Sequence, residues 1–294
     1  MVIIMNIVLL DLHPFKIING SLFYALEYTH KLVSCGVDSE LVIHIPSDPE
    51  ITTQTILSVF EEKYSCYWVG ECLVFNTYNV KIHFLTRKVD VLKKSYKANS
   101  ILFVDVYSFE NFRHSPKPKF VFSNEYYEYQ FNKLPDNCKS STKFYGYYDY
   151  QYHSKDCKAP LMINFDIFRD ILKTDNLDYV HLTDPNKFNL SYIKETVSLD
   201  EFLVKLPSKP IKNLFSKIKT IHYCQNSDVI DKNNRSLLEA QYYDIDILYY
   251  DCVSSERTIS NINRLKSRVY DEFTLSKDNK LIKDIIIYEK SCNT

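Results

Sequence analysis

Residues 6–45, NIVLLDLHPFKIINGSLFYALEYTHKLVSCGVDSELVIHI, decide the fold. The continuous apolar run at 6–11 is typical of a parallel strand that is covered on both faces. Beyond a loop, apolar residues recur at helical spacing from Leu22 to Val33, and Gly36 stands where a glycine commonly ends a helix. Residues 39–45 then predict a second strand. The stretch therefore predicts one strand–helix–strand unit with a right-handed connection.

The same alternation continues through the chain. In the first half we expect strands at 79–85, 100–106 and 118–122, and helices at 89–98 and at 51–62, the latter with Ile51, Ile56, Leu57 and Phe60 facing inward. In the second half we expect strands at 178–182, 218–223 and 245–250, and helices near 198–206, 210–217, 234–243 and over the C-terminal 40 residues. Two such blocks predict an α/β protein with two Rossmann-like domains, 1–160 and 161–294, with the chain crossing between them in the region 155–176.

Composition limits the function classes. The chain has 294 residues, 45% of them hydrophobic, and its 36 Lys and Arg residues balance 37 Asp and Glu residues, which argues against a protein coated with positive charge for nucleic acid. The 8 cysteines form no Cys-x-x-Cys pair and indicate reduced thiols in a cytoplasmic protein. The apolar N-terminus lacks a signal-peptide pattern, and no stretch reaches the ~20 residues of a bilayer span, so we expect no membrane insertion.

The first candidate site is the loop before the first helix, where Asn19, Gly20 and Ser21 follow the first strand. The first strand–helix turn of such a sheet is a usual ligand crevice, and the helix N-terminus offers free N–H groups to an anion. The alternative is an ordinary loop with Ser21 as the helix N-cap.

The second candidate site is the segment 228–240, DVIDKNNRSLLEA, where a polar loop enters a helix directly after an expected strand. Arg235 and Glu239 are four residues apart and therefore share one helical face. Such a pair could hold a nucleotide, with the guanidinium on phosphate and the carboxylate on ribose hydroxyls. The alternative is a capped helix with a salt bridge that contributes a few tenths of a kcal/mol.

The segment 221–251, IHYCQNSDVIDKNNRSLLEAQYYDIDILYYD, resembles the donor-binding region of GT-B glycosyltransferases. In that superfamily a helix carries two acidic residues separated by seven others, and here these positions hold Asp231 and Glu239. The stretch DKNNRSLLEA is similar to that of small bacterial and bacteriophage-encoded enzymes. Residues 19–43, NGSLFYALEYTHKLVSCGVDSELVI, resemble the GT-B opening, although the family often has two glycines where this chain has Asn19 and Gly20.

The resemblance implies a GT-B-like fold, with two Rossmann-like domains facing each other across a cleft. It implies sugar transfer, hexosyl or pentosyl, from a nucleotide-sugar, most simply a UDP-sugar, to an acceptor hydroxyl held by the N-terminal domain. The donor-binding residues it implies are Arg235, Glu239, Asp231, Asn234, Tyr223, Asn19, Gly20 and Ser21. We expect no tightly bound cofactor and no required metal, because the one Asp-x-Asp spacing that stands out, Asp244-Ile-Asp246, borders a strand.

An inverting transfer needs a base that deprotonates the acceptor hydroxyl. We expect it after a strand of the N-terminal domain, with Asp105 and His13 as the candidates that we favour and Asp11 and Glu125 as others. A cationic side chain should neutralise the leaving diphosphate, and Arg235, Lys187 and Lys219 are candidates for it.

Positive charge gathers locally in residues 81–119, which hold nine Lys and Arg residues against three acidic ones. The candidates for binding an acceptor or polyanion are Arg87, Lys88, Lys93, Lys94 and Arg113. If these residues form one face, they support double-stranded DNA with a hydroxymethylated base as the acceptor, as in a phage enzyme acting in the host cytoplasm. The alternative is a solvated helix surface. A surface-glycan acceptor, and a non-catalytic protein that binds a nucleotide or glycan, are the other readings.

Overall fold

The computed structural model describes residues 6–13, 20–115, 117–123, 134, 136–146, 163–174, 177–182, 215–225, 235–251 and 279–292. The chain forms two compact units, of which the first consists of Met1–Phe168 and Phe273–Thr294 and the second of Arg169–Glu272. The sequence-based division assigns all of 161–294 to the second domain, whereas the structure groups the C-terminal helix with the first unit.

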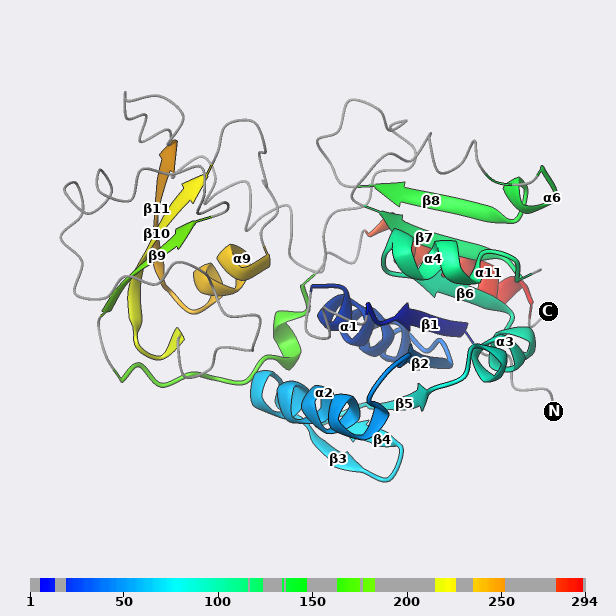
Figure 1. Ribbon diagram of the computed structural model, residues 1–294, viewed down its shortest axis with the longest axis horizontal. Coiled ribbons are helices and arrows are strands. Elements are labelled where there is room, and N and C mark those ends of the chain that lie inside the picture. Colours follow the sequence, from blue (N-terminus) through cyan, green and yellow to red (C-terminus); the bar gives the residue numbers. More distant parts are fainter. Residues whose placement is uncertain are drawn as a thin grey trace. The chain divides into compact units, whose positions relative to one another are not determined.

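The first unit is built on an eight-stranded sheet with the order β3-β4-β5-β2-β1-β6-β7-β8 (Figure 1). Its strands are β1 (Asn6–Asp11), β2 (Ser39–His44), β3 (Tyr67–Val69), β4 (Cys72–Val74), β5 (Asn79–Leu85), β6 (Ser100–Phe103), β7 (Lys119–Ser123) and β8 (Thr142–Gly146). The strands from β5 to β8 in this order run parallel. Counted along the chain, these parallel strands lie in the order 3-2-1-4-5-6 of a Rossmann sheet, which confirms the predicted fold class for this unit.

Helices cover both faces of this sheet. They are α1 (Gly20–Ser34), α2 (Pro49–Lys63), α3 (Lys88–Lys97), α4 (Val106–Phe112), α6 (Asp136–Lys139), the 3-10 turn η2 (Phe165–Ile167) and α11 (Lys280–Ser291). On one face, Val91 of α3 and Phe109 of α4 join a core cluster with Ile7, Leu9 and Phe103. On the other face, Tyr28 of α1 packs against Phe122, and Tyr288 of α11 packs against Phe120.

The central strand forms where the sequence places it. All six residues of β1 are buried, as a strand covered on both faces requires. The backbone of Gly36 has φ of +81°, and the N–H of Val37 returns to the carbonyl of Leu32, so the glycine ends α1 in the left-handed conformation that its position predicts. The predicted strand–helix–strand unit is confirmed.

Several details differ from the sequence-based expectation, among them β8, which was not predicted. Ile51 lies in the first turn of α2 and is 73% exposed, so the prediction that it faces the core is wrong. The strand predicted over 100–106 ends at Phe103, and Val106 begins α4, because the Asp105 side chain caps a helix there. The antiparallel hairpin of β3 and β4, which turns at Gly70 with φ of +61°, extends the sheet beyond β5 and was not predicted.

The second unit contains a parallel three-stranded sheet with the order β11-β10-β9. Its elements are β9 (Leu177–Leu182), β10 (Ile218–Gln225), α9 (Arg235–Tyr242) and β11 (Asp246–Asp251). The predicted strands and the helix at 234–243 are confirmed within one or two residues. The helix predicted at 198–206, most of that at 210–217 and the apolar series 259–273 lie outside the described residues.

Candidate functional site

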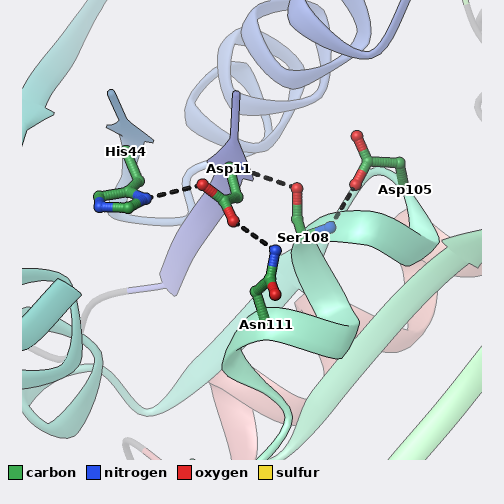
Figure 2. Close-up of polar contacts among 5 residues, drawn as sticks. All are labelled: Asp11, His44, Asp105, Ser108 and Asn111. Carbon is green, nitrogen blue, oxygen red and sulfur yellow. Dashed lines mark hydrogen bonds and ion pairs between the residues drawn. The ribbon is translucent and has the colours of Figure 1, made fainter. Parts of the chain in front are cut away.

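Polar side chains of the first unit gather at the carboxyl ends of its central strands. In this order of strands the connections diverge between β1 and β6, and ligands of such sheets bind at the carboxyl edge at this point. Asp11 ends β1 and His44 ends β2, while Asp105 follows β6. We call these residues, with Ser108 and Asn111 of α4, the switch-point cluster (Figure 2).

Asp11 is the centre of this cluster. Its Oδ1 lies 2.7 Å from Nδ1 of His44, and its Oδ2 accepts a hydrogen bond of 2.6 Å from Nδ2 of Asn111. Its backbone N–H donates to Oγ of Ser108 at 2.8 Å. Asp11 and His44 are buried and face each other in register on neighbouring parallel strands. The carboxylate is therefore held by groups from two other elements, β2 and α4.

Asp105, the first candidate base, lies in the same cluster but serves as a helix cap. Its Oδ1 accepts the backbone N–H of Ser108 at 2.8 Å, in the N-cap position of α4. Burial raises the pKa of the Asp105 carboxyl and the charge of Asp11 adds to this, while hydrogen bonds from Ser108 and Ser21 act in the opposite direction. Ser21, in the first turn of α1, therefore contacts Asp105.

Two other predicted residues from the region of the first loop, His13 and Gly20, are among the described residues. The His13 ring packs against Tyr107 at 5.3 Å between ring centroids. Gly20 is the first residue of α1, and a Cβ atom added to it would lie 3.5 Å from the Tyr24 ring, which is an ordinary contact. The surroundings of Gly20 therefore do not require a glycine. Asn19 lies outside the described residues.

The second unit brings Arg235 and Glu239 together. Nε of Arg235 lies 2.5 Å from Oε1 of Glu239, and the residues are only 8% and 6% exposed. An exposed pair at this spacing stabilises a helix by ~0.2–0.5 kcal/mol, but a buried pair must first offset the loss of hydration of both charges. Stabilisation of the helix is therefore a poor explanation for a pair buried to this extent.

The helix that carries this pair connects two parallel strands of the second unit. The chain passes from β10 to α9 and returns through residues 243–245 to β11, which is parallel to β10. Tyr223 lies within β10, opposite Tyr249 and His181, while Asp231 and Asn234 lie outside the described residues.

Three of the five candidate cations of the first unit pair with carboxylates, and the other two contact or follow helix α4. Arg87 and Lys93 pair with Asp90 on the same helix, at 2.6 and 3.9 Å. Lys94 pairs with Glu40 at 2.6 Å, near the amino end of β2 and thus far from the carboxyl edge. The Lys88 ammonium lies over the Phe112 ring at 5.2 Å. Arg113 follows the last turn of α4, and its Nε is buried without a hydrogen-bond partner among the described residues.

Sequence reasoning did not predict His44, Ser108 and Asn111. His44 ends an apolar run, and its partner Asp11 is 33 residues away. The signal that could have found the pair is register, because both residues are the last of two neighbouring parallel strands. No group of three or more His, Cys, Asp or Glu that could hold a metal occurs among the described residues, and no helix among them is long and apolar enough to cross a bilayer.

Three solved structures show similarity over nearly the whole chain. A glycosyltransferase from Rickettsia africae shares 7% identity, with 99% of both chains covered and a TM-score of 0.48. MurG of Acinetobacter baumannii shares 6% identity, with 97% of this chain and 90% of that one covered and a TM-score of 0.43. UDP-GlcNAc 2-epimerase of Neisseria meningitidis, bound to UDP-GlcNAc, shares 11% identity, with 99% and 94% covered and a TM-score of 0.44. No protein-family model and no curated protein matches the sequence.

Proposed function

We propose that this protein is a glycosyltransferase that takes a hexosyl or pentosyl group from a nucleotide-sugar, in the first instance a UDP-sugar. The second unit binds most of the donor and the first unit binds the acceptor, in a GT-B-like arrangement. The observation that carries the proposal is the buried pair of Arg235 and Glu239, which occupies the helix that the sequence resemblance assigns to the donor.

The chemistry of the pair fits a nucleoside diphosphate. A guanidinium binds phosphate oxygens through paired N–H groups, and a carboxylate accepts hydrogen bonds from the two ribose hydroxyls. In the protein alone the two groups neutralise each other inside the unit. A donor that carries both a diphosphate and a ribose offers each of them a new partner and so offsets the cost of separating them.

The remaining residues take their roles within this proposal. Asn19, Gly20, Ser21, Tyr223, Asp231 and Asn234 complete the donor side. Asp105 and His13 stand beside the acceptor hydroxyl, although the capping bond of Asp105 reduces its freedom to accept a proton. Arg235 or the exposed Lys219 neutralises the leaving diphosphate, and Lys187 has the same assigned role.

The acceptor is either a glycan or a hydroxymethylated base in DNA. Three of the five cations that favoured DNA pair with carboxylates of the first unit. These pairs reduce the positive charge that a phosphate backbone would meet, so they favour the glycan. Binding to duplex DNA at increasing salt distinguishes the two, because a DNA acceptor predicts a steep fall in affinity with salt.

Ligand-induced stabilisation tests the donor site. The protein is melted with UDP-, GDP-, ADP- and CMP-sugars, since a ligand at 100 times its Kd stabilises by about 2.7 kcal/mol. The parent should shift with one nucleotide family, and Glu239→Gln should lose the shift, whereas Glu110→Gln, an exposed Glu of α4, should keep it. An equal shift in parent and Glu239→Gln contradicts the donor site, and no shift with any donor contradicts the proposed function. A rise in melting temperature without turnover of the donor indicates a non-catalytic protein that binds a nucleotide or glycan.

A further inference from the structure

The side chains around Asp11 form an ordered chain of hydrogen bonds. Asn111 Nδ2 donates to Oδ2 of Asp11 at 2.6 Å, and Oδ1 of Asp11 lies 2.7 Å from Nδ1 of His44 (Figure 2). Each carboxylate oxygen thus has its own partner, one from α4 and one from β2. We call Asn111, Asp11 and His44 the Asp11 relay.

This chain of bonds fixes the proton on the imidazole. A carboxylate only accepts hydrogen bonds, so the contact of 2.7 Å requires that Nδ1 of His44 carries the hydrogen. In the neutral ring the second nitrogen, Nε2, then has a free lone pair. Figure 2 shows this nitrogen on the side of the ring that faces away from Asp11. Asp11 therefore sets both the tautomer and the direction of His44, as the carboxylate does in a Ser-His-Asp triad.

The Asp11 relay lies where a substrate would bind, which favours a catalytic role over a purely structural one. It lies at the carboxyl edge of the sheet at the point where the connections diverge, which is the usual ligand crevice of this fold. The His44 side chain is 11% exposed, so part of it reaches the surface of the unit. The alternative bases of the cluster are occupied, since Asp11 already accepts two bonds and Asp105 caps α4.

We infer that His44 is the general base of the reaction, and that Asp11 and Asn111 are positioning residues for it. The inference rests on the proposed function. As the acceptor oxygen forms its bond to the anomeric carbon, Nε2 of His44 takes the acceptor proton. The bond between the anomeric carbon and the diphosphate oxygen breaks, and the nucleoside diphosphate leaves with that electron pair. When water is the acceptor, the same step hydrolyses the donor.

Donor hydrolysis tests the inference without knowledge of the acceptor. His44→Asn keeps an amide N–H at the position of Nδ1 and so keeps the bond to Asp11, but it removes Nε2. A positioned base contributes about 10²–10⁴-fold to the rate, so kcat should fall by that factor while donor affinity stays unchanged. Asp11→Asn should also lower kcat and leave affinity unchanged, because the amide no longer fixes the tautomer.

The chain offers a matched control in His83→Gln. Nε2 of His83 also bonds a carboxylate, Glu40 Oε2, at 2.8 Å, and both side chains are largely buried. Glu40 lies four residues before His44 along β2, about 13 Å toward the amino edge. His83→Gln keeps this hydrogen bond and should leave kcat unchanged. If the relay only stabilised the sheet, His44→Asn and His83→Gln would have similar melting temperatures and similar kcat values for donor hydrolysis.

The outcomes separate the two proposals. If the parent hydrolyses a donor and His44→Asn hydrolyses it at the same rate, the inference is wrong while the proposed function stands. If His44→Asn fails to fold, donor hydrolysis by His44→Ala is measured with added imidazole. Recovery of the hydrolysis rate supports the inference, and no recovery contradicts it. If the parent binds no nucleotide-sugar, the proposed function fails and the inference fails with it.

Discussion

Removal of the Glu40 charge should destabilise the first unit at neutral pH and flatten its response to acid. Glu40 is buried near the start of β2, 2.8 Å from Nε2 of His83 and 2.6 Å from Nζ of Lys94. Burial alone raises the pKa of its carboxyl, but hydrogen bonds from His83 and Lys94 and their positive charges outweigh this and lower the pKa from 4.5 to about 2. The charged form is thus favoured in the folded protein.

The size of the effect follows from this pKa. Each pKa unit corresponds to about 1.4 kcal/mol, so the change from 4.5 to about 2 corresponds to about 3 kcal/mol. Because the pKa is lower in the folded state, this stabilisation is complete above the unfolded value of 4.5 and is lost as pH falls through 2. In a unit of this size about 3 kcal/mol shifts Tm by about 6–12 °C.

Thermal and urea unfolding of the parent and Glu40→Gln between pH 7 and pH 2.5 measure both effects. The matched control is Asp90→Asn, whose carboxylate pairs with the largely exposed side chains of Arg87 and Lys93 and should contribute less than ~1 kcal/mol. The reasoning is refuted if Glu40→Gln costs no more than Asp90→Asn at pH 7. It is also refuted if the variant loses as much stability as the parent between pH 4.5 and pH 2.5.

Three further predictions concern the backbone, a buried carboxyl and the reaction. Gly36→Ala should lower the free energy of unfolding in urea by about 1 kcal/mol, because φ at this position is +81°. A Cβ there would meet nothing within 4 Å, so an unchanged free energy of unfolding would contradict backbone strain. Glu27→Gln should cost about 1–3 kcal/mol, since the buried carboxylate accepts from the Tyr64 hydroxyl at 2.6 Å and the Asn164 N–H at 3.1 Å. A double-mutant cycle with Tyr64→Phe should then be less than additive, and full additivity would contradict a shared bond. The product sugar should have inverted anomeric configuration by NMR, because a base-assisted single displacement inverts the carbon, and a retained configuration would contradict His44 as the base.

Most strands of both units were predictable because each contains a continuous apolar run, but β3, β4 and β8 were not predicted. A stretch such as NIVLLD cannot remain exposed, and a run of that length suits a covered parallel strand. The β3–β4 hairpin was missed because each of its strands has only three residues, too few for a period to be recognised. Helix α4 was missed because Val104 and Val106 continue the apolar run of β6, and the Asp105 cap between them decides against a longer strand.

The Arg235–Glu239 pair could be predicted from the sequence, whereas the Asp11–His44 pair could not. Arg235 and Glu239 are four residues apart on a helix, so their contact follows from local geometry alone, although the burial of the pair does not. Asp11 and His44 meet only because two strands lie side by side in a particular register. The spacing of residues along the chain does not reveal the register of two strands. The sequence therefore favoured Asp105 and His13 as bases over the pair of Asp11 and His44.

The attachment of α11 to the first unit bears on how the protein is made. Glu289 of this helix accepts hydrogen bonds from Ser100 and from Nδ2 of Asn99, at the amino end of β6, and Asp284 accepts one from the Tyr145 hydroxyl. The ribosome therefore synthesises the whole second unit before it synthesises α11, the helix with which these residues of the first unit form hydrogen bonds. During synthesis the second unit is free to fold as one uninterrupted segment, whereas the part of the first unit that α11 covers stays open until that helix has been synthesised.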